Sequence, residues 1–323
     1  MLVLGSQLLK LYLQLGGLAL LGFILGRLLP PKIPLYIGKF LFWIGVPIGV
    51  IAFVRRSDLS GSIWLAPAIA WVAILLGVGL SWLWIRSKTN SGSASEKQGQ
   101  SSLWSHQPTQ GSFVLSTMVG NTGFIGYPVT LALVGEQYFA WALFYDLLGT
   151  VIGAYGLGAL LAARYGEGSK SYKQFIHAIV YNPTLWSLGF GLLVRDIPLP
   201  PLLENSLQRF AWSAIALSLI LCGMRLSQLH SWSSLKPASV SLVIKMLIVP
   251  LFLGIILSFW GLDRPALLIL VLQMAMPPAF ATLVLAETYN LDRDLAVTAL
   301  GLGSVGLLIT LPIWVLMFGI PTA

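Results

Sequence analysis

Long apolar stretches separated by short polar connections dominate the hydropathy pattern of this chain. Because a helix needs roughly 20 mainly apolar residues to cross a membrane, each stretch is predicted to be a membrane-spanning helix. The ten predicted helices cover approximately residues 8–29, 35–54, 63–85, 113–135, 138–163, 176–194, 205–224, 237–260, 265–286 and 295–318. The expected fold class is therefore an all-α polytopic membrane protein. The one long polar stretch, 87–112, is rich in Ser, Gly and Gln and is predicted to be a flexible cytoplasmic loop.

Composition supports this fold class and excludes others. The 323 residues are 57% hydrophobic and 9% charged, whereas soluble globular domains carry roughly 25% charged residues. A water-soluble protein of this composition could not cover its surface, and a disordered chain would be far more polar. The net charge of +8 arises mainly from loops, so it indicates topology rather than nucleic-acid binding. The single cysteine, Cys222, excludes an intramolecular disulfide framework, and no metal site or cofactor is expected.

The distribution of Lys and Arg among the loops predicts the orientation. These residues are more frequent in the loops that follow the first, third, fifth, seventh and ninth helices. The richer side is expected to face the cytoplasm, which places both termini outside. The expected location is the plasma (inner) membrane.

The two halves of the chain resemble each other. The segment 22–40 can be aligned with 189–210, and 128–136 can be aligned with 279–287. These matches predict a first five-helix repeat over 1–163, a cytoplasmic connector over 164–175 and a second repeat over 176–323. Because five is odd, the second repeat is expected to be inverted in the membrane, as in many secondary transporters.

The fourth and ninth helices each contain a segment that disfavours a continuous helix. These segments are GNTGFIGYP, Gly120 to Pro128, and QMAMPPAF, Gln273 to Phe280. Two broken helices would place half-helix N-termini near the bilayer centre, where free N–H groups favour an anion such as a carboxylate. The alternative is a pair of proline kinks with small residues for helix packing. The candidate substrate-binding residues are Asn121, Thr122, Gly123, Gly126, Pro128, Gln273, Pro277, Pro278 and Thr282.

Two charged residues lie well inside predicted helices. Asp146 belongs to the fifth helix, and Lys245 belongs to the eighth helix, away from both breaks. A charge near the bilayer centre usually faces a partner or a cavity, so both residues are candidates for coupling or gating. The alternative is that both lie near the lipid headgroups. No nucleophile–base arrangement is present, so the chain is not expected to be an enzyme.

Four motifs give the chain a resemblance to a known family. GNTGFIGYP (120–128), VYNPTLWSLGFGLL (180–193), KMLIVPL (245–251) and MPPAFATLVLAETYNLDRDLA (276–296) resemble the auxin efflux carrier family of membrane transporters. The resemblance implies two inverted five-helix repeats in the architecture of bile acid–sodium symporters, with helices 4 and 9 as broken crossover helices. It also implies a homodimer formed through scaffold helices 1, 2, 6 and 7, and organic anions as substrates.

The chain departs from this family at two positions in its helices, and it also lacks the long central loop of many plant members. Family members often have Asn in the ninth helix where this chain has Ala281, and the third helix is uncharged from Leu59 to Ile85. These departures argue against auxin itself as the substrate.

The expected function is secondary active transport of a small organic anion by alternating access, with the anion bound at the helix 4/9 crossover. A monocarboxylate, a dicarboxylate or an auxin-like acid would fit, and H⁺ and Na⁺ both stay open as coupling ions. The expected partners are this anion and the lipid bilayer, with no nucleic acid. One alternative is a sodium-coupled organic-anion symporter, and another is a non-transporting membrane sensor or scaffold.

Overall fold

The computed structural model describes residues 12–59, 61–92, 103–166, 180–228 and 234–319. These residues form helices joined by turns and short extended segments, and they contain no strand apart from a single bridge between Gly120 and Pro278. Six of the described helices are long and apolar enough to cross a membrane, and four shorter helices are also apolar. The all-helical membrane fold predicted from the sequence is therefore confirmed, while the inverted relation between its halves stays a prediction.

Helices in the first half of the chain follow the predicted order. They are α2 (Gly17–Leu28), α3 (Ile33–Phe40), α4 (Val46–Arg56), α5 (Leu65–Gly92), α6 (Gln107–Met118), α7 (Tyr127–Leu133), α8 (Phe139–Phe144) and α9 (Ala159–Tyr165). Wider π-helical turns extend several of them, at Tyr12–Gly16, Leu41–Gly45, Thr122–Gly126, Tyr145–Val151 and Ala154–Gly158. A short 3-10 turn, Leu103–Ser105, precedes α6.

The second half continues with α11 (Pro183–Leu193), α12 (Pro201–Ser227), α13 (Leu235–Leu242), α14 (Val249–Ser258), α15 (Arg264–Met274), α16 (Phe280–Thr288) and α17 (Arg293–Phe318). A π-helical segment, Val243–Ile248, joins α13 to α14. Most of the predicted connector 164–175 lies outside the described residues.

The helix α5 is longer than its apolar sequence predicts. It extends to Gly92, and α6 begins at Gln107, so both helices enter the polar stretch 87–112. The cationic groups of Arg86 and Lys88 lie 5.2 and 4.9 Å from the ring centres of Trp82 and Trp84 on the same helix. These contacts between side chains four residues apart stabilise the additional helical turns.

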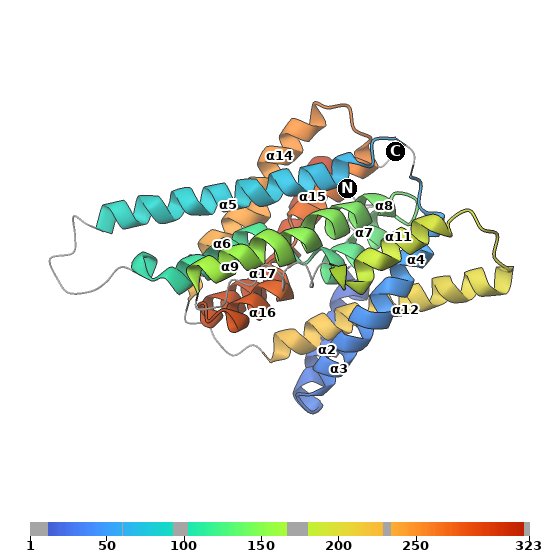
Figure 1. The fold of residues 1–323 in the computed structure, drawn as a ribbon, viewed down its shortest axis with the longest axis horizontal. Helices are drawn as coiled ribbons and strands as arrows, with labels where there is room; N and C mark the ends of the chain where they lie inside the picture. Colours follow the sequence, from blue (N-terminus) through green and yellow to red (C-terminus); the bar gives the residue numbers. More distant parts are fainter. Residues whose placement is uncertain (1–11, 60, 93–102, 167–179, 229–233, 320–323) are drawn as a thin grey trace.

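The helices form two packed groups (Figure 1). In the first group, α2 packs along α12, and α11 and α12 pack on α4; α5–α9 and α13–α17 form the second group. The contact between α2 and α12 is unusually close, because a Cβ on Gly22 would lie 2.0 Å from the carbonyl oxygen of Ile220. On the other helix, a Cβ on Gly223 would lie 1.9 Å from the Ala19 carbonyl oxygen. Only glycine at both positions permits this approach.

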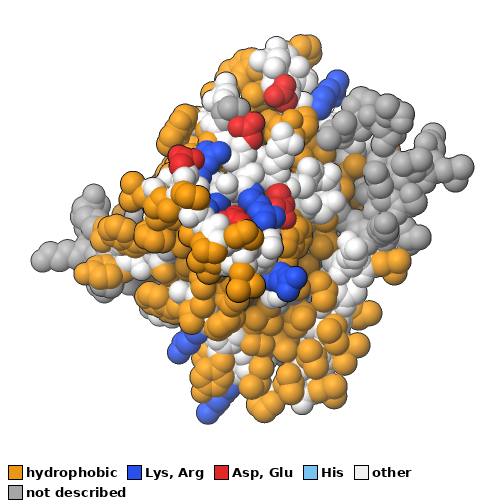
Figure 2. Space-filling model, turned by 90° about the vertical axis from the view of Figure 1, so that its right-hand side faces the viewer, with side chains coloured by type: hydrophobic (Ala, Val, Ile, Leu, Met, Phe, Trp, Pro, Cys, Tyr) orange, Lys and Arg blue, Asp and Glu red, His pale blue; other side chains and the backbone are white. Residues whose placement is uncertain are grey.

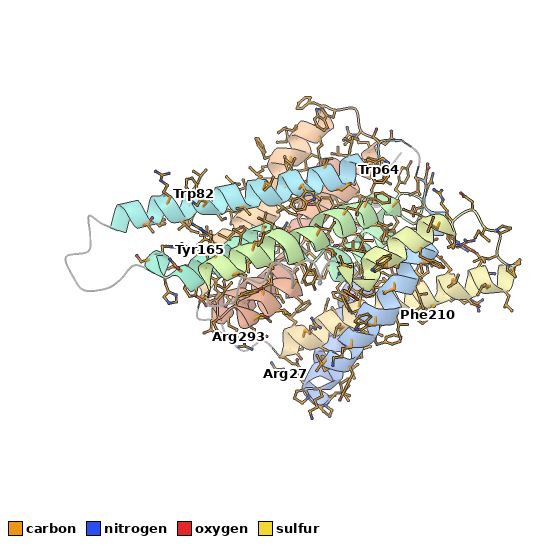
Figure 3. All side chains as sticks on the ribbon, in the orientation of Figure 1. Arg27, Trp64, Trp82, Tyr165, Phe210 and Arg293 are labelled. Atoms are coloured by element: carbon orange, nitrogen blue, oxygen red, sulfur yellow. The ribbon has the colours of Figure 1, made fainter. Side chains whose placement is uncertain are left out.

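Apolar side chains cover much of the outer surface, as expected for a protein solvated by lipid (Figure 2). Trp64 lies directly before α5 and Trp82 lies within this helix, and both side chains are exposed (Figure 3). Trp82 is eighteen positions after Trp64, which corresponds to about 27 Å along a helix and is close to the thickness of the hydrocarbon core. Tryptophan at these two levels is typical of membrane interfaces.

Candidate functional site

The two predicted helix breaks lie against each other. The backbone N–H of Asn121 donates to the carbonyl oxygen of Pro277 at 2.7 Å, and the N–H of Ala279 donates to the carbonyl oxygen of Val119 at 3.1 Å. This pair of hydrogen bonds forms an antiparallel bridge centred on Gly120 and Pro278. Interrupted helices in a membrane must satisfy their freed backbone groups, and each break here provides partners for the other.

Local sequence explains where each helix ends. The helix α6 ends at Met118, the backbone is extended at Val119 (φ −108°, ψ 118°), and helical structure resumes at Thr122. The helix α15 ends at Met274, and the backbone is again extended at Ala279 (φ −74°, ψ 153°) before α16 begins. The prolines between them, Pro277 and Pro278, have no N–H to donate and cannot continue a helix.

A cavity of about 320 Å³ lies beside this crossover. Its walls combine polar groups from segments that are far apart in the sequence, with apolar side chains between them. The polar contributors are Asn121 and Thr122 from the fourth-helix break, Asp146 and Thr150 from the following helix, Asn182 and Thr184 from the start of α11, Tyr155, Lys39 and Arg225. The first two residues of each half-helix, Thr122 and Gly123 and Phe280 and Ala281, also line the cavity, and the N–H groups of a first helical turn have no acceptor within their own helix.

Asp146 is buried in the protein, with 6% of its surface exposed. One carboxylate oxygen accepts a hydrogen bond from the hydroxyl of Thr122, and the other accepts one from the hydroxyl of Tyr127 at 2.7 Å. A Cβ on Gly123 would lie 3.2 Å from the second oxygen, so glycine allows the helix start to approach this carboxylate. The negative charge therefore lies beside a helix N-terminus, where it is favoured.

Lys245 also lies beside the crossover, contrary to the expectation that it is remote from both breaks. Its side chain is 2% exposed. A Cβ on Gly120 would lie 3.4 Å from the Lys245 ammonium nitrogen and 3.3 Å from the carbonyl oxygen of Met276. The ammonium group is thus close to the C-terminal ends of α6 and α15, where a positive charge is favoured. No pattern in the sequence indicates this position, because it depends on how α13 and its π-helical extension pack against α6.

Asp146 and Lys245 do not form an ion pair with each other among the described residues. Asp146 lines the cavity beside the helix that begins with Thr122, whereas Lys245 is not part of the cavity wall. The structure therefore places one buried charge of each sign at the crossover. Each charge complements the partial charge of the nearest half-helix ends.

Comparison with known proteins identifies the family to which this chain belongs. Residues 7–315 match the model of a family described as "Membrane transport protein". The chain belongs to this family. It is the auxin efflux carrier family that the sequence motifs resemble.

Two similar archaeal proteins are also described as transporters. The chain is 29% identical over 306 residues to a protein of Methanothermobacter thermautotrophicus, described as an uncharacterized transporter, and the match covers 92% of this chain and 94% of that protein. A second relative, an uncharacterized transporter of Methanocaldococcus jannaschii, is 33% identical over 122 residues, which are 36% of this chain and 39% of the relative. This member of the family is therefore a multi-pass integral membrane transporter and not an enzyme.

Three of the nine predicted binding residues line the transporter's cavity, namely Asn121, Thr122 and Gly123. Two others contact each other outside the cavity wall: the Gln273 side chain is fully buried, and a Cβ on Gly126 would lie 2.4 Å from its carbonyl oxygen. The amide nitrogen of Gln273 donates to the Thr130 hydroxyl at 3.2 Å, which joins α15 to α7.

The other predicted residues shape the half-helices instead of lining the cavity. The hydroxyl of Thr282 donates to the Ala279 carbonyl oxygen at 2.7 Å, and therefore stabilises the start of its own helix. Pro128 lies in the first turn of α7, while Pro277 and Pro278 precede α16. Pro277 and Pro278 determine where the second half-helix begins, whereas Pro128 lies six residues after the start of the first one at Thr122.

Arg225 is a cavity residue that sequence reasoning missed. It follows about twenty apolar residues and precedes a polar loop, so its position resembles that of any arginine at a membrane interface. In the structure its guanidinium carbon lies 4.8 Å from the centre of the Phe280 ring, at the start of α16.

Asn182 is a second cavity residue that was not predicted, although its neighbours in the sequence indicate a helix start. An Asn directly before Pro183 is typical of a helix start, and the Asn182 side chain accepts a hydrogen bond from the Thr184 backbone N–H at 3.0 Å.

Proposed function

We propose that this protein is a secondary active transporter of a small organic anion, which binds in the cavity beside the crossover. The observation that carries the proposal is the composition of the cavity wall. Two helix starts with free N–H groups, the side chains of Asn121 and Asn182, and the guanidinium of Arg225 converge on one space. Helix N-termini and arginine both favour negatively charged groups such as carboxylates.

The cavity volume and its apolar surface support a small amphipathic ligand. About 320 Å³ is at the lower end of the range for small-molecule sites. The side chains of Phe42, Val46 and Phe124 line the wall between the polar groups. They would surround the apolar part of a ligand whose charged end lies at the crossover.

The packing of the helices supports the inverted repeat. The contact of α2 with α12 has a counterpart in the contact of α11 with α4, which joins the corresponding helices of the opposite halves. Similarly, α5 packs on Tyr145–Val151, and α13 packs on α17. We propose that α2, α3, α4, α11 and α12 form a scaffold that dimerises, and that the other helices move against it.

A difference between the two sides of the crossover supports alternating access. On one side, the exposed residues Leu35, Lys39 and Trp43 border the cavity. On the other side, aromatic rings pack where the two helix groups meet: the ring centre of Phe53 in the scaffold lies 4.9 Å from that of Phe139 in the other group, and 5.9 Å from that of Trp212 within the scaffold.

Ionic contacts extend this aromatic seal to the surface. A guanidinium nitrogen of Arg56 lies 3.7 Å from a carboxylate oxygen of Glu136, and the other Glu136 oxygen accepts a hydrogen bond from the Trp212 indole at 2.9 Å. Arg56 and Trp212 belong to the scaffold group, whereas Glu136 lies in the turn between α7 and α8. Opening of this side would require these contacts to separate.

We further propose that Asp146 carries a coupling proton. Its carboxylate lies between the cavity and the first turn of a half-helix, so protonation would change the electrostatics at both places. A sodium ion is the alternative coupling ion, and uptake driven by a sodium gradient at constant pH distinguishes the two.

Counterflow in liposomes tests the proposed function. Proteoliposomes loaded with an unlabelled carboxylate are diluted into trace amounts of the labelled compound, for a panel of acetate, benzoate, succinate and indole-3-acetate. We expect at least one carboxylate to accumulate transiently, and the matching uncharged amide not to accumulate. Accumulation of the amides, or of none of the carboxylates, would contradict organic-anion transport.

A further inference from the structure

The wall of the cavity contains a cation whose charge no acidic side chain neutralises. Among the described residues, the guanidinium of Arg225 has no ion pair and no side-chain hydrogen bond. Its one close contact with a ring is the 4.8 Å approach to Phe280. A charge that is half-buried without a partner is costly, so a site that contains one is suited to an incoming opposite charge.

The only acidic side chain in the described cavity wall is engaged elsewhere. Both oxygens of Asp146 accept hydrogen bonds from hydroxyl groups, one from Thr122 and one from Tyr127. Arg225 therefore keeps its donors available for another group in the cavity.

The surroundings of Arg225 hold its guanidinium in a defined orientation. Phe280, the first residue of α16, supports one face of the planar group. On the α3 side, a Cβ on Gly38 would lie 2.7 Å from a terminal guanidinium nitrogen, so only glycine leaves the space that this nitrogen needs. Stacking on a ring leaves the N–H groups at the guanidinium edge free, and this edge matches the two oxygens of a carboxylate.

We infer that Arg225 pairs directly with the carboxylate group of the transported anion, on the Phe280 ring as a platform. The inference rests on the proposed function and assigns the counter-charge of the site to a side chain of α12. The N–H groups at the crossover then position the anion, while the positive charge of Arg225 makes the site selective for a negatively charged ligand. Because α12 belongs to the scaffold group and Phe280 to the other group, the pair forms across the boundary at which the two groups would move.

Chemical protection tests this pairing without a transport assay. The purified full-length protein is treated with phenylglyoxal, which modifies accessible guanidinium groups, and modification of Arg225 is measured by mass spectrometry. Acetate, benzoate and succinate are each added, with acetamide, benzamide and succinamide as uncharged counterparts. Arg209, which is exposed on the same helix, is the internal control.

We expect at least one carboxylate to slow the modification of Arg225 several-fold, with no effect of its amide and no change at Arg209. Equal modification with and without every carboxylate would overturn the inference. Failure of Arg225 to react under any condition would also overturn it, because a guanidinium that faces the cavity is accessible to so small a reagent.

Binding by the variants provides the second measurement, by thermal-shift titration with the protecting carboxylate. Arg225→Gln is expected to lower affinity about ten- to a hundredfold, in line with loss of a hydrogen-bonded charge, and Arg225→Lys is expected to keep part of it. Gly38→Ala is expected to weaken binding by displacing the guanidinium, whereas Gly49→Ala, whose added Cβ would meet no atom within 4 Å, is the matched control. Unchanged affinity in Arg225→Gln would overturn the inference.

The outcomes separate this inference from the proposed function. Carboxylate counterflow by the wild-type protein together with full activity of Arg225→Gln would leave the transport function intact and remove Arg225 from the site. Protection of Arg225 without counterflow of any carboxylate would support an anion site and contradict transport of the anion.

Discussion

Asn121 and Pro277 are joined by a 2.7 Å hydrogen bond from a backbone N–H to a carbonyl oxygen, which connects the two interrupted helices. The bond uses only main-chain atoms, and Asn121 also lines the adjacent cavity. The residue thus combines a structural role of its backbone with a proposed binding role of its amide.

This separation predicts the behaviour of Asn121→Ala. The main-chain bridge is retained, so the melting temperature should change little, while the loss of a hydrogen bond to a charged ligand should cost about 1.5–3 kcal/mol of binding, or roughly ten- to a hundredfold in affinity. Carboxylate titrations of the variant measure this loss. Asn205→Ala, on an exposed part of α12, is the control. Unchanged affinity in Asn121→Ala would remove its side chain from the site.

The prolines of the second break provide a test of the crossover itself. Replacement of Pro277 and Pro278 together by Ala restores two N–H donors and favours a continuous helix between α15 and α16. We expect anion binding to fall sharply while the protein stays folded, because the helix start that faces the cavity would be lost. Circular dichroism and thermal-shift titration measure the two effects.

Pro312→Ala is the matched control for that variant, because Pro312 lies inside α17 and away from the crossover. It should leave affinity unchanged. Full affinity in the double variant would show that the broken helix is unnecessary for binding.

Asp146→Asn should alter the pH dependence of transport more than it alters substrate binding. The substitution preserves the size of the side chain but removes the only titratable acid in the described cavity wall. A transporter that moves a proton on this carboxylate should show uptake nearly independent of pH after the change. Uptake against pH in liposomes gives the comparison.

Glu287→Gln is the control for the acid, because Glu287 is exposed and paired with Arg293 at 2.8 Å, outside the cavity. It should keep the wild-type pH profile. Parallel profiles for Asp146→Asn and the wild type would assign Asp146 a structural role.

The proposed seal predicts that Glu136 controls how often the closed side opens. Its ion pair with Arg56 is partly exposed, so Glu136→Gln should shift the equilibrium between the closed and open states of this side by no more than about 1 kcal/mol, roughly fivefold. The probe is a cysteine at Ala214, which is 7% exposed in the sealed contact, introduced together with Cys222→Ala. Maleimide labelling of this cysteine should become several-fold faster in Glu136→Gln.

Glu204→Gln tests whether any loss of acidic charge has this effect. Glu204 pairs with Arg55 at 3.1 Å and with Arg56 at 3.7 Å, but all three residues belong to the scaffold group, so loss of these pairs removes no contact between the two groups and labelling should not accelerate as it does in Glu136→Gln. Equal labelling rates in the wild type and Glu136→Gln would indicate that the contact does not limit opening.

The residue types along the chain predict the helices and their two interruptions. Apolar runs of membrane length specify helices because backbone groups in lipid must be satisfied within the segment. Glycine-rich and Pro-Pro segments interrupt such helices for reasons that lie in the residues themselves. The observed ends of α6 at Met118 and α15 at Met274 agree with this local reasoning.

The binding residues were predicted less completely, because proximity to a break in the sequence does not give the direction of a side chain. Asn121, Thr122 and Gly123 face the cavity, but Gln273 turns toward Thr130, and Thr282 bonds its own helix. Asp146 was identified by the cost of its charge in a membrane, although its two hydroxyl partners were not foreseen.

The sequence by itself determined that this chain is a membrane protein, where its helices run and where two of them break, because these features depend on residues that are neighbours along the chain. The tertiary structure decided that the breaks bridge each other, that Lys245 lies at Gly120 and that Arg225 stacks on Phe280 in a cavity. Arg225 and Phe280 are 55 positions apart, and no periodicity or composition links them. Their contact exists because the last turn of α12, which carries Arg225, lies beside the first residue of α16, and only the assembled helices bring these two positions together.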